Sequence, residues 1–218
     1  NEFIASLRED EKMGVKAFDD KRDQFEDEVY RRKLYHMHYR LKKNLAVIRN
    51  QLRDVDTPDS EHAYSSEKEF INDLYLIRDS LISHGEYSAA NGSLKDVIRI
   101  AETFGFHMVA LDLRQESTLH TNVVKEIISQ SNIGNYEKLD EAERIQFLSS
   151  QIESGKRPKF DIKKLTEGNQ KTFDLFQTIY EMRNEISARC IGSYVISMTH
   201  TASHIMEVMY LGYLVGLA

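Results

Sequence analysis

Cysteine and proline are scarce in this sequence. Its single cysteine, Cys190, excludes an internal disulfide and is typical of a protein from a reducing compartment. Because Cys190 lies in an apolar stretch without a neighbouring base, we expect a buried structural thiol. The two prolines, Pro58 and Pro158, leave long stretches of the 218 residues free to form helices.

An excess of positive charge is also lacking. The chain has 35 acidic and 29 basic side chains, which gives a formal net charge of −6. Proteins that bind phosphate backbones are usually basic, so the composition argues against nucleic acid as a partner. The mixture of aromatic and basic residues between Tyr30 and Lys43 is better explained as a solvated helix face.

No hydrophobic run is long enough to predict a membrane span. A span needs roughly 20 mostly apolar residues, and serine, threonine and histidine side chains interrupt the most apolar stretch, 186–218. That stretch is therefore expected to be part of a buried core. The first residues show no basic start followed by an apolar run, so we expect no signal peptide and a cytoplasmic location.

The first half of the chain shows helical periodicity. Apolar residues from Tyr30 to Leu52 recur every three or four positions, which predicts a long amphipathic helix with this stripe buried. The turn-forming residues of 54–65 then predict a loop. The predicted solvent face of the helix is basic and consists of Arg31, Arg32, Lys33, Arg40, Lys42 and Lys43.

Two further helices are expected before residue 106. Ser66 and Glu69 have the spacing of a capping box, and Gly85 can end the helix that they begin. Ser93 resembles another helix start, and Gly105 can end that helix. The predicted inner faces are Phe70, Leu74, Ile77 and Leu81 in the first helix, and Leu94, Val97, Ile98 and Ala101 in the second.

From residue 106 the period changes. Residues 106–113 are nearly all apolar and too few for a buried helix, so we predict a strand covered on both faces. A second strand is predicted at 194–198. Helices are expected between the strands, at about 121–130, 140–153 and 170–187, and a last helix is expected to begin near Thr201 or Ser203.

A strand, a long helical crossover and a second strand are typical of a parallel sheet or barrel. Two strands cannot close a barrel, so we expect the full protein to contain more strands than this sequence does. The predicted fold class is mostly α, from an α/β parent. It divides into a helical N-terminal part, 1–105, and a segment of an incomplete (β/α) TIM-like barrel, 106–218, that contributes two parallel strands.

The first predicted strand ends in a polar stretch. In barrel folds, functional sites are built at the carboxyl ends of the strands. Arg114 at this place offers a planar fork that can bind phosphate through two hydrogen bonds. The spacing alone leaves an alternative open, in which Asp112 and Arg114 form a structural salt bridge at the rim.

Three blocks resemble the phosphoenolpyruvate carboxylase family. Residues 104–117, F-G-F-H-M-V-A-L-D-L-R-Q-E-S, are followed by His120-Thr121 and resemble the family's F-G start, apolar strand, D-I-R-Q-E-S motif and nearby H-T pair. The block S-Y-V-I-S-M at 193–198 is similar to the family's Y-V-I-S-M segment. A weaker match is E-V-Y-R at 28–31, where Val29 replaces the proline of the family's E-P-Y-R.

The resemblance implies a lyase that joins bicarbonate to phosphoenolpyruvate and gives oxaloacetate and phosphate. Such enzymes fix carbon dioxide, supply the tricarboxylic acid cycle, use Mg²⁺ or Mn²⁺ and are expected to be homotetramers. In the family, the arginine of D-I-R-Q-E-S contacts the substrate phosphate, and this role passes to Arg114. Gln115 and Glu116 are expected to position Arg114, and Ser197 is expected to face the same cavity.

Several family features are missing from this sequence. They are the T-A-H-P-T-E block with the catalytic histidine, the mobile loop rich in glycine and arginine, and the glutamate and aspartate that bind the metal. We therefore expect the 218 residues alone to be inactive, with no catalytic residue and no metal ligand. Leu119, Ala202 and His204 depart from the family's pattern and indicate a diverged branch.

One alternative function remains, and one possible metal site is weighed beside it. The chain can instead belong to a non-catalytic helical interaction or regulatory module that retains the family's scaffold. His200 and His204 are four residues apart and, with Glu207, resemble a metal-binding helix face. A metal site is not expected there, because the helix begins only near residue 202 and no glutamate follows His200.

Overall fold

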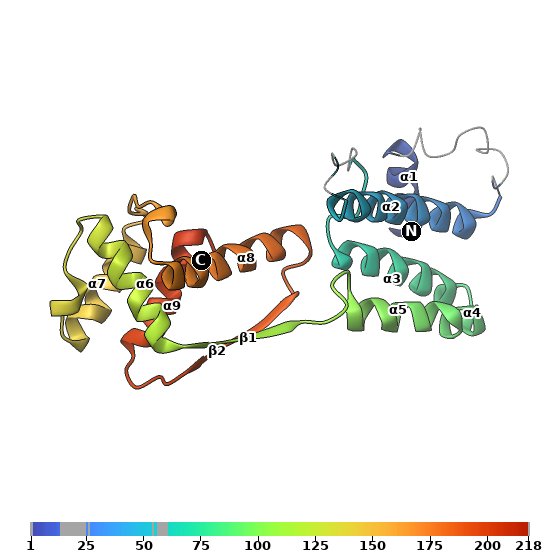
Figure 1. Ribbon diagram of the computed structural model, residues 1–218. Helices are drawn as coiled ribbons and strands as arrows, with labels where there is room; N and C mark the ends of the chain where they lie inside the picture. Colours follow the sequence, from blue (N-terminus) through green and yellow to red (C-terminus); the bar gives the residue numbers. More distant parts are fainter. Residues whose placement is uncertain (1, 14–24, 26, 54, 56–60, 218) are drawn as a thin grey trace. The chain divides into compact units, whose positions relative to one another are not determined.

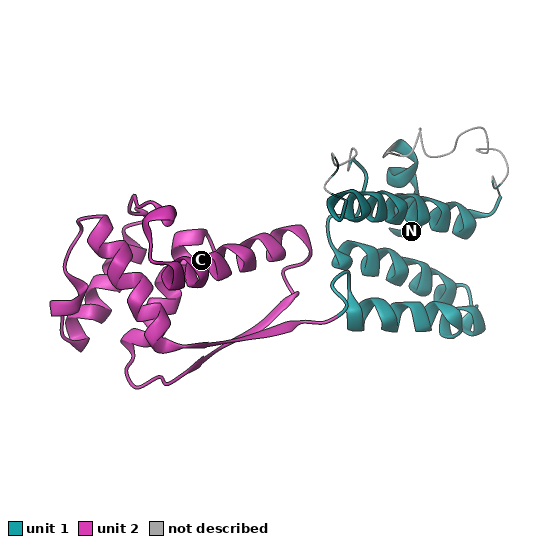
Figure 2. Ribbon diagram, viewed as in Figure 1, with its two compact units in different colours: residues 1–108 teal, residues 109–218 magenta. Residues whose placement is uncertain are grey.

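A computed structural model describes residues 2–13, 25, 27–53, 55 and 61–217 of the chain. The chain divides into two compact units, residues 1–108 and 109–218 (Figure 2). The division at residues 105 and 106 that the sequence suggests stays a prediction, because its second part is defined by a barrel that needs further strands.

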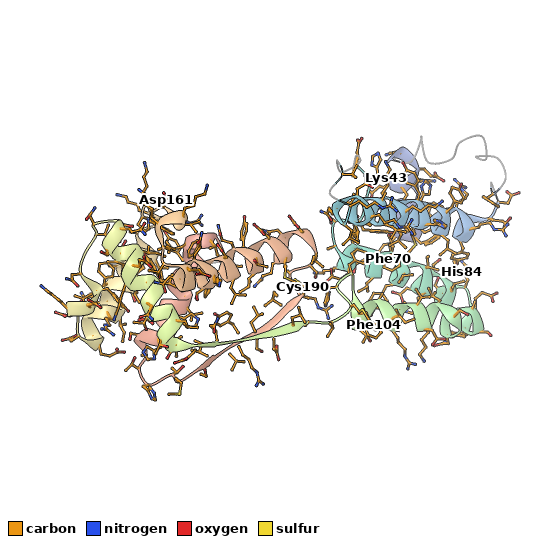
Figure 3. The ribbon with its side chains drawn as sticks, viewed as in Figure 1. Lys43, Phe70, His84, Phe104, Asp161 and Cys190 are labelled. Atoms are coloured by element: carbon orange, nitrogen blue, oxygen red, sulfur yellow. The ribbon has the colours of Figure 1, made fainter. Side chains whose placement is uncertain are left out.

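The described part of the first unit is helical. Phe70 projects from the third helix into its core (Figure 3), where its ring stacks on that of Phe106 with 6.1 Å between centroids. The buried apolar residues of this core are Phe3, Met37, Tyr64, Leu74, Ile77, Ile98 and Ala101. The helices are α1 (Glu2–Met13), α2 (Val29–Gln51), α3 (Glu67–Ser83), α4 (Tyr87–Asn91) and α5 (Ser93–Phe104).

Local signals predicted the starts and ends of α3 and α5. The Ser66 side chain accepts a hydrogen bond from the Glu69 N–H at 3.4 Å. The Glu69 carboxylate, however, accepts from the N–H of Ser65, so only half of the predicted capping box forms. Gly85 and Gly105 follow the two helices with φ of 82° and 52°, values that side chains disfavour. Four of the eight predicted inner-face residues are buried, but Val97 is 42% exposed.

The buried face of α2 differs from the predicted one. Lys33 and Arg40, expected in solvent, are buried, because Lys33 binds Asp10 and Asp73 and Arg40 binds Glu69. Apolar periodicity carries no information about charged partners on other helices. The stripe residues that the structure leaves exposed are Leu34, Leu45, Ile48 and Leu52. Of the predicted loop, residues 54 and 56–60 lie outside the described residues, and 61–65 form turns and irregular structure.

The second unit contains a two-stranded parallel sheet and four α-helices in its described part. The strands lie side by side with α6 and α8 on one side of them (Figure 1). This arrangement confirms the mostly helical class with two parallel strands. The elements are β1 (Leu111–Glu116), α6 (Ser117–Gln130), α7 (Glu141–Glu153), α8 (Glu167–Glu185), β2 (Ile191–Ser197) and α9 (Ser203–Val215), with 3-10 turns at Tyr136–Lys138 and Ile162–Lys164.

The first strand was predicted too early in the chain. Residues 106–109 form turns and bends, with Met108 at a φ of 62°. Pairing with the second strand begins where the Leu111 N–H donates to the Cys190 carbonyl at 2.9 Å, and it continues through the polar motif. Neither face of β1 is fully covered by the described residues, and Leu111 is 47% exposed. The hydrophobic run therefore marks an apolar segment, whereas the bounds of β1 are set by its hydrogen bonds to β2.

The core of the second unit lies among its helices, and the sheet contacts it through Tyr194. Tyr194 of β2 packs on Phe176 of α8, with 5.4 Å between ring centroids. Cys190, just before β2, is 2% exposed and its thiol lies 3.4 Å from the Met182 carbonyl (Figure 3), which confirms the buried thiol. The buried apolar residues are Val123, Val124, Ile127, Ile128, Tyr136, Leu148, Leu165, Phe173, Phe176, Tyr210, Leu211, Tyr213 and Leu214.

Candidate functional site

The two faces of the parallel sheet have different neighbours. Side chains alternate between the faces of a strand, and residues paired across parallel strands share a face. The helix-facing side carries Leu113, Gln115, Tyr194 and Ile196, all half-buried. The opposite side carries Arg114, Glu116, Val195 and Ser197, all exposed. No helix of the described second unit covers this side (Figure 1), which we call the helix-free face, and it is the candidate site.

Arg114 lies in β1, paired with Val195 of β2. Its guanidinium group makes no ion pair or hydrogen bond with any residue that the structure describes. The salt bridge to Asp112, left open by the spacing, is not formed; the Asp112 carboxylate instead accepts the N–H of Ser193 at 2.8 Å. An arginine with all its donors open on an exposed strand face is suited to bind an anion.

The three supporting residues differ in their placement. Ser197 shares the face of Arg114, and its hydroxyl donates to the Gln115 carbonyl at 3.3 Å. Glu116 is also on this face, where it accepts from the Thr118 hydroxyl at 2.8 Å. Gln115 points to the helix side by alternation. Neither Gln115 nor Glu116 contacts Arg114 within the described residues, so their positioning role stays a prediction.

Side-chain bonds to the backbone join the two strands at both ends. Asp112 accepts from Ser193 near the start of the pairing. At its end, the fully buried Ser117 donates to the Met198 carbonyl at 2.7 Å. Sequence reasoning missed both bonds, although Asp112 and Ser117 belong to the same motif as Arg114. Their partners lie 81 residues away, where no periodicity signal reaches.

A buried polar cluster supports the sheet from the helix side. Glu207 of α9 is fully buried and accepts from Thr121 at 2.6 Å and Tyr136 at 2.9 Å, and burial raises its pKa. His120 Nε2 lies 2.8 Å from the Tyr194 hydroxyl, and burial lowers the pKa of His120 to about 4. No sequence signal indicated these contacts. They tie α6, α9 and β2 together behind the candidate site.

Metal ligands are not grouped in the described part of the chain, where no three His, Cys, Asp or Glu side chains are placed to hold an ion. His204 Nδ1 accepts from the His200 N–H at 3.4 Å, and Glu207 is occupied by its two hydroxyl donors. His200, His204 and Glu207 therefore do not form the metal-binding group that their spacing resembles. Across the described ranges, no helix is both long and apolar enough to cross a membrane.

Comparison with known proteins identifies relatives along the whole sequence. The family model described as phosphoenolpyruvate carboxylase matches residues 1–218. A phosphoenolpyruvate carboxylase of Roseiflexus castenholzii is 31% identical over 87% of this chain and 21% of its own length. That of Prochlorococcus marinus strain AS9601 is 30% identical over 99% of this chain and 23% of its own length. That of Solanum tuberosum is 39% identical over 68% of this chain and 15% of its own length.

The chain spans about a fifth of the length of the curated relatives that it matches. The family match covers both compact units, and it includes the strand that carries Arg114 and the strand paired with it. Because the family model matches all 218 residues of this sequence, the chain belongs to the phosphoenolpyruvate carboxylase family.

Proposed function

We propose that the full-length parent of this chain joins bicarbonate to phosphoenolpyruvate, giving oxaloacetate and phosphate, and that this chain supplies a phosphate-binding arginine. Arg114 carries the proposal: it is an exposed arginine without an ion pair among the described residues, on the helix-free face of a parallel strand. Family membership supplies the chemistry, and the relatives named above are phosphoenolpyruvate carboxylases by name.

We expect the parent to form a (β/α) barrel, in which the helix-free face would have a defined position. In a (β/α) barrel the helices surround the strands, so the face without helices forms the inner wall. The carboxyl ends of the strands then face the active site. Arg114 and Ser197 lie in the carboxyl-terminal halves of their strands, on the helix-free face. The parent is therefore expected to complete a TIM-like barrel around them.

The proposed role of Arg114 is to stabilise the negative charge of the transferring phosphoryl group. In the route that the family resemblance implies, the phosphoryl group moves from phosphoenolpyruvate to bicarbonate, and the pyruvate enolate is then carboxylated. The phosphoryl oxygens carry spread negative charge during this transfer, and a fixed guanidinium group stabilises that charge through paired hydrogen bonds. Arg114 binds and orients the phosphate, while proton transfer depends on residues elsewhere in the parent.

The remaining requirements also concern the parent. Its Mg²⁺ or Mn²⁺ would supply Lewis-acid stabilisation of substrate oxygens and would be held by residues outside this chain. We infer a cytoplasmic homotetramer with phosphoenolpyruvate and bicarbonate as substrates and with no nucleic-acid or membrane partner. The competing proposal is a parent that retains the scaffold as a regulatory or interaction module without turnover.

The test is steady-state kinetics of Arg114→Lys in the full-length parent, beside a thermal melt. Lysine keeps the charge but loses the two-pronged geometry, so kcat/KM should fall by about 10²-fold or more, with kcat affected as well as KM. Arg183→Lys, at an exposed position of α8, is the matched control and should be neutral. Parental kcat/KM in a folded Arg114→Lys enzyme contradicts the phosphate-binding role. A folded parent without turnover favours the regulatory module.

A further inference from the structure

The pairing of β1 and β2 contains an irregularity just before Arg114. Leu111 pairs with Ile191, but Leu113 pairs with Tyr194, so β2 has one extra residue in this interval. At this bulge the Ser193 N–H donates to Asp112 Oδ1 at 2.8 Å. Bulges re-aim the side chains that follow them.

Gly192 makes room for the carboxylate at the bulge. A Cβ atom at this position would lie 2.5 Å from Asp112 Oδ1, closer than side-chain atoms approach one another. Any larger residue therefore requires the Asp112 carboxylate or the adjacent backbone to shift. Gly192, the Asp112 carboxylate and the Ser193 N–H that it accepts therefore form one structural unit.

The bulge decides which residue lies beside Arg114. If pairing continued from Leu111 and Ile191 without the extra residue, Arg114 would pair with Tyr194. Tyr194 packs against His120 and Phe176 on the helix side, so that register would draw Arg114 toward the core or expose Tyr194. With the bulge, Arg114 pairs with Val195 on the helix-free face.

We propose that Asp112 is a positioning residue: its carboxylate holds the Ser193 N–H, fixes the bulge and thereby sets Arg114 on the face that binds substrate phosphate. This inference rests on the proposed function of Arg114. Asp112 acts through the strand register, since its carboxylate makes no ion pair with Arg114 among the described residues.

The first test replaces Asp112 in the full-length parent. Asp112→Ala should lower kcat/KM by about tenfold or more, because small displacements of a positioned group cost that much. It should also speed hydrogen exchange of the Ser193 amide, which loses its acceptor. Asp112→Asn keeps an acceptor oxygen and should restore most of both properties. Asp174→Ala, at an exposed position of α8, is the matched control.

The second test uses Gly192. Gly192→Ala should reproduce the Asp112→Ala defect, and combining the two should add little, because each breaks the same contact. Gly168→Ala is the control, since a Cβ atom there meets open space. Full additivity of the two substitutions contradicts a shared structural unit. If Asp112→Ala does not fold, the comparison of Gly192→Ala with Gly168→Ala still tests the proposal, since Gly192→Ala keeps every polar group.

The third test separates positioning from general stability. In an Arg114→Ala background, Asp112→Ala should cause less than about a twofold further loss, because Asp112 acts through Arg114. An equal loss in both backgrounds, or unchanged Ser193 exchange in folded Asp112→Ala, overturns the positioning role. Undiminished kcat/KM in Arg114→Ala alone instead overturns the proposed function, and Ser193 exchange still reports whether Asp112 fixes the bulge.

Discussion

Lys33 is fully buried in the helical unit, and its ammonium group donates to Asp10 at 2.6 Å, Asp73 at 2.5 Å and Ser6 at 2.9 Å. Burial raises the pKa of Asp10, and the bond from Lys33 opposes that shift. Removing one partner of such a cluster leaves uncompensated charges in a poorly solvated place. The cluster joins α1, α2 and α3.

Lys33→Met keeps much of the side-chain volume but removes the charge. We expect the free energy of unfolding to fall by about 3 kcal/mol, because Asp10 and Asp73 lose their buried cation. Arg40, with a nitrogen 3.7 Å from Asp73, limits the loss. Urea denaturation measures it, with the exposed Lys68→Met as control. A loss no larger than that of the control contradicts the role of the cluster.

His120 gives the chain a sensitivity to acid. Burial lowers its pKa from 6.5 to about 4, so the folded chain keeps it neutral where the unfolded chain is protonated. The free energy of unfolding therefore keeps its full value with respect to His120 above pH 6.5, and it decreases as the pH falls toward 4. At about 1.4 kcal/mol per pKa unit, the loss is on the order of 3 kcal/mol.

His120→Gln should therefore flatten the fall in stability between pH 6.5 and pH 4, whatever its effect at neutral pH. His36, whose pKa burial also lowers to about 4, leaves part of the dependence in place. Asp10 and Glu207, whose pKa values are raised, contribute a pH dependence of stability of the opposite sign. Comparing His120→Gln with the unsubstituted chain cancels their contributions. Denaturation curves across this range test it, with the exposed His38→Gln as control. Equal slopes in all three proteins contradict the buried neutral imidazole.

Among the elements, α7 has the complete capping box. Asp140 accepts from the Glu143 N–H at 2.9 Å, and the Glu143 side chain accepts from the Asp140 N–H at 2.9 Å. We expect Asp140→Ala to lower the free energy of unfolding by about 1 to 2 kcal/mol, against less than about 0.5 kcal/mol for Asp174→Ala. Urea denaturation decides, and equal losses in the two variants contradict the cap.

Local signals explain which elements the sequence predicts well. Helices α3, α5, α6, α7, α8 and α9 follow from apolar periodicity with polar or glycine boundaries, all within a few residues. The bounds of β1 depend on β2, far along the chain, so the strand was predicted several residues early. The buried face of α2 depends on carboxylates of α1 and α3, so the stripe was misassigned.

The residues of the candidate site also differ in whether local sequence signals predict them. Arg114 follows from a motif that its own neighbours make recognisable, and the structure places it on the helix-free face. Asp112 and Ser117 act on backbone groups of Ser193 and Met198, which only the fold brings near. The buried polar cluster of Glu207 has no linear signature at all.

At the scale of the whole molecule, the second unit exposes a sheet face that the parent is expected to enclose. Val109, Leu111, Val195 and Met198 are between 42% and 61% exposed, around two strands whose outer edges are unpaired in the described chain. Exposed apolar side chains beside open strand edges promote association. We expect the isolated chain to self-associate as its concentration rises.

Sedimentation over a concentration series tests this expectation. Val195→Lys should weaken the association by placing a charge on the sheet face. Val97→Lys is a matched control, because Val97 of α5 is equally exposed, at 42%, but lies on a helix of the first unit. A monomer at high concentration, or equal effects of the two lysines, contradicts association through the sheet.

We propose that this chain is one segment of a carboxylating enzyme and holds only part of its active site. The most direct measurement is a coupled oxaloacetate assay with phosphoenolpyruvate, bicarbonate and Mg²⁺, run on the full-length parent and on these 218 residues. We expect turnover by the parent and none by the isolated chain, because a phosphate contact cannot replace a general base and a metal. An inactive folded parent, or metal-dependent turnover by the isolated chain, would contradict the account.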